Sequence, residues 1–270
     1  KPTTHHLYRN DGSMKFTEVT ETLGISAKGY DVSCFWGDID NDGDLDLFLA
    51  NSTGRGAAAD KNYGANTLLR NNGDGTFTDV SKESGVDIVT NSRGCTMGDV
   101  DNDGDLDIYV TNSMADALLF INDGKGRFTE SATKLGGGVF YAHGCALGDL
   151  DNDGDLDLVA GNWRNVGAFN PGEWKVFRNK KNTPNSIKVN VHGKVSNRSA
   201  VMSRVMVYKM GMAKNKAGFI AMREITAGNG TFPGNPLQVH VGIGAVKSCD
   251  VVVTFPTTGR EVIFSNVTPG

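Results

Sequence analysis

One acidic motif occurs three times in this chain, and it constrains the fold more than any other feature. Its copies read SCFWGDIDNDGDLDLFLANS, GCTMGDVDNDGDLDIYVTNS and GCALGDLDNDGDLDLVAGNW, and they align without a gap. Their first aspartates, Asp38, Asp99 and Asp149, are 61 and 50 residues apart. Self-similarity at such periods indicates a repeat architecture. Each copy places crowded carboxylates beside an apolar run, so the loop needs a cation to balance its charge.

A second motif recurs between the acidic ones. It reads LYRNDGSMKFTEV from Leu7, LLRNNGDGTFTDV from Leu68 and LLFINDGKGRFTES from Leu118. Asn-Gly and Asp-Gly pairs accept positive φ and are strong hairpin signals. Together the two motifs predict four short strands per unit, with no convincing helical periodicity. Four-stranded units at this spacing are typical of propeller blades. The predicted fold class is therefore all-β, with partial propeller blades of four antiparallel strands followed by a small β-sandwich.

The charge distribution predicts a boundary near residue 180. Residues 1–179 contain 15 Lys and Arg against 28 Asp and Glu, whereas residues 180–270 contain 12 against 3. We therefore expect blades in residues 1–180 and a separate unit in residues 181–270. Six β runs in the second segment, from SIKVNVHG to EVIFSNV, predict the sandwich. Its basic charge fits a solvated surface or an acidic partner, and no nucleic-acid motif accompanies it.

The acidic loops have the spacing of a calcium-binding loop. Carboxylates at alternate positions converge as the chain curls, and Gly at position 6 permits the sharp turn. Hard oxygen ligands without nearby Cys or His favour Ca²⁺ over zinc or copper. The prediction is three Ca²⁺ sites, whose ligands are positions 1, 3, 5, 7 and 9 of each loop. These are Asp38, Asp40, Asp42, Asp44 and Asp46; Asp99, Asp101, Asp103, Asp105 and Asp107; and Asp149, Asp151, Asp153, Asp155 and Asp157.

The loops differ from a true EF-hand. Position 12, where a bidentate Glu belongs, is Leu49, Val110 or Ala160. β-type runs flank the loops in place of helices. We therefore expect the Asp at position 9 to close the coordination shell, with position 7 contributing its backbone carbonyl. A surface Asp-Gly turn without metal is the alternative, and three gapless copies argue against it.

The remaining reactive side chains do not form a recognisable catalytic motif. Cys34, Cys95 and Cys145 occupy the same place in three repeats, too far apart for disulfides, and Cys249 is alone in the second segment. All four are predicted to be free thiols. The chain contains no GxSxG, HExxH or P-loop pattern, so an enzyme is not expected. No apolar run reaches the length of a membrane span.

The repeats GDxDNDGDLDL and LxRNNGDGTFTDV resemble FG-GAP/VCBS repeats, which build calcium-binding propellers of the integrin-α type. The tail resembles the ASPIC/UnbV domain that follows such repeats in the cartilage acidic protein-like family. The stretches that carry this are SNRSAV, REITAGNG, NPLQVHVGIG and FPTTGREV. The tail departs from the family at Met202, where Gly is usual, and at FPTTG. The resemblance implies a secreted or cell-surface, non-enzymatic role and Ca²⁺ at loop positions 1, 3, 5, 7 and 9.

The chain supplies half a blade and about three repeats, whereas closed propellers use roughly four to eight blades. We expect a fragment of a longer chain, completion by another chain, or an open arc. Three hypotheses for function follow. The first is a calcium-stabilised extracellular module that binds a protein or glycan ligand. The second is a structural subunit of a surface filament or matrix that associates with copies of itself. The third, and least favoured, is an enzyme acting on polysaccharide.

Overall fold

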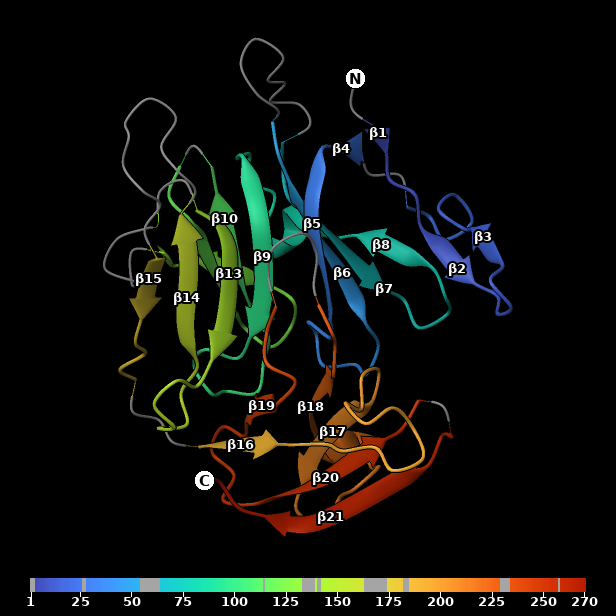
Figure 1. Cartoon of the computed structure of the whole chain (residues 1–270), viewed down its shortest axis with the longest axis vertical. Coiled ribbons are helices and arrows are strands. Elements are labelled where there is room, and N and C mark those ends of the chain that lie inside the picture. The colour runs from blue at the N-terminus through green and yellow to red at the C-terminus, as the bar shows by residue number, and fades with distance from the viewer. Residues whose placement is uncertain are drawn as a thin grey trace.

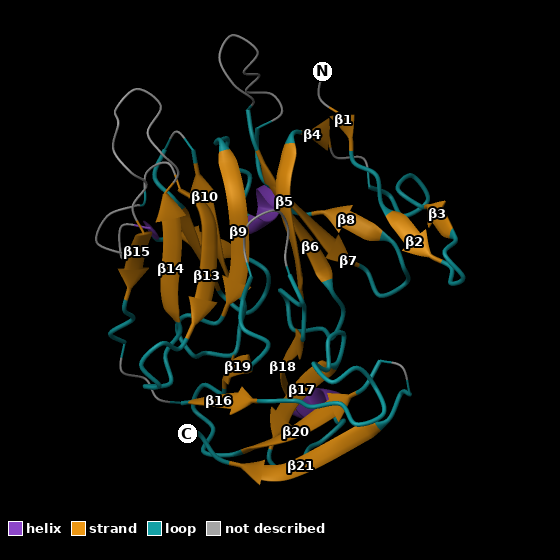
Figure 2. Cartoon of the chain, viewed as in Figure 1, coloured by secondary structure: helices purple, strands orange, loops and turns teal. Residues whose placement is uncertain are grey.

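The structure is a computed structural model of the chain. It describes residues 3–25, 28–53, 64–113, 115–132, 139, 142–162, 174–181, 185–228, 234–256 and 258–270. In these residues the secondary structure is almost entirely antiparallel β (Figure 2). The prediction of an all-β chain with blade-like sheets is confirmed.

Besides one pair of two-residue strands, the N-terminal part contains sheets of two, four, four and three strands (Figure 1). The first is a hairpin of β2 (Tyr8–Asn10) and β3 (Phe16–Glu18). The second comprises β5 (Asp31–Gly37), β6 (Asp46–Asn51), β7 (Thr67–Asn71) and β8 (Phe77–Asp79). The third comprises β9 (Ser92–Gly98), β10 (Asp107–Asn112), β11 (Leu118–Asn122) and β12 (Phe128–Glu130). The fourth comprises β13 (Ala142–Gly148), β14 (Asp157–Asn162) and β15 (Trp174–Phe177).

A few short elements were not anticipated. The helix α1 (Ser81–Ser84) follows β8 and ends at Gly85, whose φ is +81°. A 3₁₀ turn covers Lys216–Gly218, and β1 (Thr3–Thr4) pairs with β4 (Lys28–Gly29). Each is too short to produce a periodic sequence pattern, so hydrophobic spacing does not reveal them.

The first strands of successive sheets, β5, β9 and β13, lie side by side (Figure 1). Glycine before each acidic loop permits this close approach. A Cβ on Gly37 would lie 2.7 Å from Sδ of Met97, and one on Gly98 would lie 2.7 Å from Cδ1 of Leu147. Buried side chains such as Phe48 and Phe120 fill the space between these sheets. The sheets therefore pack face to face like successive propeller blades.

The C-terminal part has its own apolar core, centred on Val205, Val207 and Val251. One sheet has the strand order β18 (Phe219–Glu224), β17 (Arg204–Lys209), β20 (Cys249–Thr254) and β21 (Glu261–Val267). The other consists of β16 (Ser186–Val189) and β19 (Val239–Gly242).

The segment before β19 joins the C-terminal part to the blades. Oδ1 of Asn235 accepts hydrogen bonds from Thr96 at 2.8 Å and from the backbone of Leu147 at 3.0 Å, while its Nδ2 donates to Met97 O at 2.9 Å. A Cβ on Gly148 would lie 3.3 Å from Pro236. Gly148 of β13 is equivalent to Gly37 and Gly98, which contact the next blade, and here Pro236 takes the place of that blade. The C-terminal part therefore packs directly against the inner strands.

The four cysteines are free thiols, as predicted. Cys95, Cys145 and Cys249 are buried and Cys34 is half-buried. Among the helices of the described residues, none has the length and apolar character that a membrane span requires.

Candidate metal centres

Each acidic motif forms the loop between the first two strands of its sheet. The loops run from β5 to β6, from β9 to β10 and from β13 to β14. The Gly at position 6 adopts a φ of +99°, +105° and +92° in the three loops. The Asn at position 4 is also left-handed, with φ values of +55°, +60° and +60°. These two left-handed residues turn the chain back on itself, so the carboxylates face a common point.

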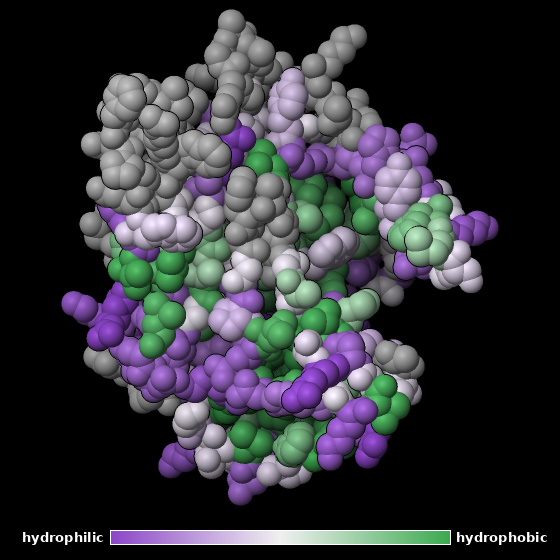
Figure 3. All heavy atoms as spheres, in the orientation of Figure 1, coloured by the Kyte–Doolittle hydropathy of each residue, from purple (hydrophilic) through white to green (hydrophobic). Residues whose placement is uncertain are grey.

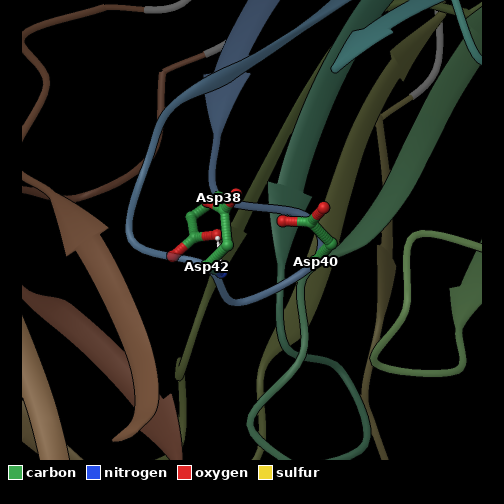
Figure 4. A group of neighbouring side chains, drawn as sticks. All are labelled: Asp38, Asp40 and Asp42. Carbon is green, nitrogen blue, oxygen red and sulfur yellow. Dashed lines mark hydrogen bonds between the residues drawn. The ribbon is translucent and has the colours of Figure 1, made fainter. Parts of the chain in front are cut away.

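Each loop brings three carboxylates together. Their nearest oxygens lie within 4.8 Å of one another, and two oxygens that ligate one Ca²⁺ from opposite sides are about 5 Å apart. The first loop gathers positions 1, 3 and 5 (Figure 4), whereas the other two gather positions 1, 3 and 9. The groups are Asp38, Asp40 and Asp42; Asp99, Asp101 and Asp107; and Asp149, Asp151 and Asp157.

The Asp at position 1 organises its own loop. The two oxygens of Asp38 accept hydrogen bonds from the backbone of Asp42 and of Gly43, both at 3.1 Å. The same pair of bonds recurs in the second and third loops, on Asp99 and Asp149. The Asp at position 5 accepts from the backbone two residues on, as Asp42 does from Asp44 at 2.9 Å. These bonds hold the turn in shape.

The Asp at position 9 connects its loop to the third strand of the sheet. Oδ2 of Asp46 accepts from the backbone of Ile39 at 2.9 Å, and Oδ1 accepts from the backbone of Asn71 at 2.7 Å. The same two bonds recur on Asp107 and Asp157. The second motif of each repeat, which contains Asn71, Asn122 or Asn179, therefore supports the acidic loop of the first.

The Asp at position 7 joins neighbouring loops. Asp105 accepts a hydrogen bond at 2.6 Å from the side chain of Asn41, which stands at position 4 of the preceding loop. Asp155 accepts at 2.7 Å from Asn102 in the same way. Asp44, in the first loop, is outside the carboxylate group of that loop. We expect the residue at position 7 to bind Ca²⁺ only through its backbone carbonyl. The side chain of this aspartate is therefore available for the hydrogen bond to the neighbouring loop.

The Asp at position 3 is different from all the others. Its Oδ1 is buried and has no hydrogen-bond donor among the described residues, and this holds for Asp40, Asp101 and Asp151 alike. A buried carboxylate oxygen without a partner costs free energy. Such oxygens recur in all three loops, each beside two further carboxylates, and this arrangement fits a bound cation.

Burial makes the first two loops unfavourable as anions. It raises the pKa of Asp38 and of Asp107 to about 8, and repulsion from neighbouring aspartates adds to the effect. Burial likewise raises the pKa of Asp46 to about 7 and that of Asp99 to about 6. A bound divalent cation reverses this balance because it favours the ionised form of its ligands.

Basic side chains of the C-terminal part reach the second and third loops. Arg223 is buried, donates to Gly104 O at 2.9 Å and lies 3.9 Å from Oδ2 of Asp99. Nζ of Lys188 lies 2.8 Å from Oδ2 of Asp149. Although burial alone would raise the pKa of Asp149, the hydrogen bond and charge of Lys188 lower it overall. These contacts neutralise part of the loop charge, as do Lys181, whose Nζ lies 3.1 Å from Oδ2 of Asp101, and Arg178, whose Nε lies 3.0 Å from Oδ2 of Asp151. The Oδ1 atoms at position 3 keep no hydrogen-bond partner among the described residues.

The donor set therefore fits a hard divalent cation such as Ca²⁺. Every member of the three groups is a carboxylate, and none is Cys or His. Position 12 of each loop lies within a buried strand, so no EF-hand Glu is possible there.

The sheets and loops define a class, namely a repeat protein of antiparallel β blades with an acidic cluster in the first hairpin of each blade. The FG-GAP-like repeat family matches residues 2–49, 56–110 and 99–160, which is more than half of the chain. The protein belongs to this family. It is also similar to cartilage acidic protein 1 of Xenopus tropicalis, with 36% identity over 90 residues. That alignment covers 32% of this chain and 14% of the relative, so the chain spans much less than two thirds of it.

Several residues of the site were not singled out from the sequence. The Asn at position 4 could have been noticed, because it is invariant among the three copies. Arg223, Lys188 and Gly242 could not, since they are more than 30 residues from the loops they contact. The backbone of Gly242 donates to Oδ2 of Asp99 at 2.8 Å. Only the packing of the C-terminal part against the blades brings these groups to the carboxylates.

Proposed function

We propose that this protein is a calcium-stabilised extracellular binding module without catalytic activity. The observation that carries the proposal is the buried, unpartnered Oδ1 at position 3 of all three loops. Bound Ca²⁺ would supply the missing positive charge and hold the blade hairpins rigid. The fifteen aspartates of positions 1, 3, 5, 7 and 9 are the proposed ligand set, with position 7 acting through its backbone carbonyl.

The binding role rests on the family and on the relative. FG-GAP-like repeats form a rigid scaffold whose connecting loops are free to vary, which is typical of recognition proteins. The name of the relative refers to cartilage, which agrees with an extracellular location. We extend this likeness to residues 181–270 and propose that they form an ASPIC/UnbV-like domain. The ligand would be a protein or a glycan.

A catalytic role is disfavoured by the bonding of the carboxylates. Positions 1, 5 and 9 accept backbone hydrogen bonds in every loop, so these groups are fixed as structural acceptors. General acid–base catalysis needs a carboxyl group that can reach a substrate and exchange a proton. An enzyme acting on polysaccharide is therefore the least favoured hypothesis.

The metal part is tested by titrating metal-free protein with CaCl₂ in a calorimeter. The expected result is a stoichiometry of three, together with a rise in melting temperature. No detectable binding at millimolar Ca²⁺ would refute the proposal. The binding part is tested on glycan and extracellular-protein arrays, with Ca²⁺ and with EGTA. Calcium-dependent capture of a defined ligand is expected, and hydrolysis of an arrayed glycan would contradict the non-catalytic role.

The second candidate is a self-associating structural subunit, favoured by one edge of the blades. In the described part of the chain, β15 pairs only with β14 and is the outer strand of its sheet. Its Trp174 side chain is 77% exposed and Val176 is also exposed. An apolar, unpaired strand edge favours pairing with another chain. Light scattering after size exclusion separates the two candidates, since a monomer at high concentration with Ca²⁺ excludes self-association.

A further inference from the structure

The C-terminal part contains a large apolar cavity that lies outside the three metal loops. It has a volume of about 860 Å³ and opens between the chain that follows β16 and the sheet strands β20 and β21. Protein interiors pack with few voids larger than a water molecule. Ligand pockets, in contrast, have volumes of about 300–1,000 Å³. The cavity is open to solvent and has the size of a binding site.

The sheet topology explains why the cavity exists. A four-stranded sheet faces a sheet of only two strands, β16 and β19, which cannot cover it. The register pairs Val251 with Phe264 and Val253 with Val262, so these four side chains point to the same face. The two valines of β20 are buried as the floor of the cavity. Phe264 is 52% exposed, so the apolar lining continues outward to solvent.

The opposite wall is formed by residues 188–196, in which valines alternate with polar residues. Its apolar side chains are Val189 at the end of β16, followed by Val191 and Val195. Val195 is exposed and belongs to the outer rim. In the C-terminal part, Figure 3 shows green apolar surface beside a band of purple hydrophilic side chains. An apolar cavity open to water favours an occupant with a long apolar part.

The charged side chains that line the cavity are all basic. They are Lys188, Lys194 and Arg260, and His192 lies beside them, with no acidic side chain among the lining residues. Lys188 is paired with Asp149 of the third loop. Among the described residues, neither Lys194 nor Arg260 forms an ion pair with an acidic group. The cavity therefore presents an apolar floor and a positively charged rim.

We propose that this cavity binds a long-chain carboxylate, with the acyl chain against the valines and the carboxylate at Arg260 and Lys194. A guanidinium or ammonium group binds a carboxylate through charge-assisted hydrogen bonds. A neutral apolar molecule would make no ion pair with this exposed basic rim. The proposed function at the metal loops does not require this site. The calcium proposal and the carboxylate proposal are therefore tested independently.

The test measures binding of a dansylated undecanoate to the full chain, in buffer that keeps the protein folded. Laurate and 1-dodecanol then compete for the site at equal concentration. We expect saturable fluorescence enhancement, and displacement by laurate at a concentration at least tenfold lower than by 1-dodecanol. Absence of saturable binding overturns the proposal. Equal displacement by the alcohol overturns the role of the basic rim.

Two variants sharpen the test. Replacing Arg260→Gln and Lys194→Gln together is expected to weaken laurate binding about tenfold and leave displacement by 1-dodecanol unchanged. Val262→Trp should fill the cavity and abolish probe binding. Its matched control is Ile263→Trp, because Ile263 is adjacent on β21, pairs with Val252 and faces the other side of the sheet. If Val262→Trp does not fold, the double variant with Arg260→Gln and Lys194→Gln still tests the proposal. Unchanged laurate affinity in this double variant overturns the proposal.

Discussion

Asp40 offers a test in which the sign of a stability effect should depend on Ca²⁺. Its Oδ1 is buried and accepts no hydrogen bond among the described residues. Burial raises its pKa, and the neighbouring charge of Asp42 raises it further. Asp40→Asn keeps the size of the side chain and removes the charge. The variant is therefore expected to be as stable as the parent or more stable in EGTA, and less stable than the parent in Ca²⁺.

The magnitude follows from linkage. At a free Ca²⁺ concentration roughly 10 to 100 times the dissociation constant, each site adds about 1.4–2.7 kcal/mol to the free energy of unfolding. Three independent sites then add about 4–8 kcal/mol. For a chain of this size that corresponds to a rise in melting temperature of roughly 10–30 °C. Loss of the first site should remove about a third of this rise in melting temperature.

The assay is thermal unfolding followed by circular dichroism, in 10 mM CaCl₂ and in EGTA, at constant ionic strength. Asp87→Asn is the matched control, because Asp87 is an exposed aspartate outside the loops. It should leave the Ca²⁺-dependent shift unchanged. The reasoning is refuted if Asp40→Asn keeps the full shift. It is also refuted if the variant loses as much stability in EGTA as in Ca²⁺, since Asp40 would then have a purely structural role.

Three further predictions concern the blades and their thiols. In metal-free buffer the free energy of unfolding should fall as the pH rises from about 4 to about 8, as followed by urea titration. Burial raises the pKa of Asp38 and Asp107 to about 8 in the folded chain, whereas an unfolded Asp titrates near 4. The folded chain therefore binds more protons than the unfolded chain between these pH values. A rise in stability with pH would contradict this. Asn122→Ala should lower the free energy of unfolding by about 2–4 kcal/mol, because the buried amide of Asn122 donates to Leu106 O on its own blade and to Ile39 O on the preceding blade. Asn72→Ala is the control at an exposed turn and should lower it by less than about 0.5 kcal/mol. All four cysteines should react with a thiol reagent in denaturant and only slowly in the native state, where burial raises the pKa of Cys95 to about 12; fewer than three reactive thiols in denaturant would overturn the assignment.

The repeated blades could be predicted because their signals are local. The Asn-Asn-Gly turn that begins at Asn71 places positive φ at Gly73, and the strand pairing follows directly. The acidic loop is likewise a short segment, so the convergence of Asp38, Asp40 and Asp42 follows from their spacing alone. The same locality explains why α1 was missed. It is a single turn held by its neighbours and has no amphipathic pattern of its own.

The division of work among the aspartates depended on packing. From the sequence, Asp105 and Asp40 are both members of an acidic loop. In the fold, Asp105 accepts a hydrogen bond from Asn41 on the neighbouring blade, whereas Asp40 keeps an orphan oxygen. This difference arises between blades, where the sequence separation is 64 residues and no local rule applies.

The β class, the repeat and the three acidic turns could be read from the amino-acid sequence, because the repeated motif is visible in the chain and turn chemistry acts within a few residues. Packing between distant segments brings Arg223 and Lys188 to the loops and Pro236 to the inner strand of the last blade, and it leaves an apolar cavity open beside a two-stranded sheet. These features depend on how two apolar cores meet and on how many strands each layer contains. Both are properties of the whole chain, and no single segment encodes them.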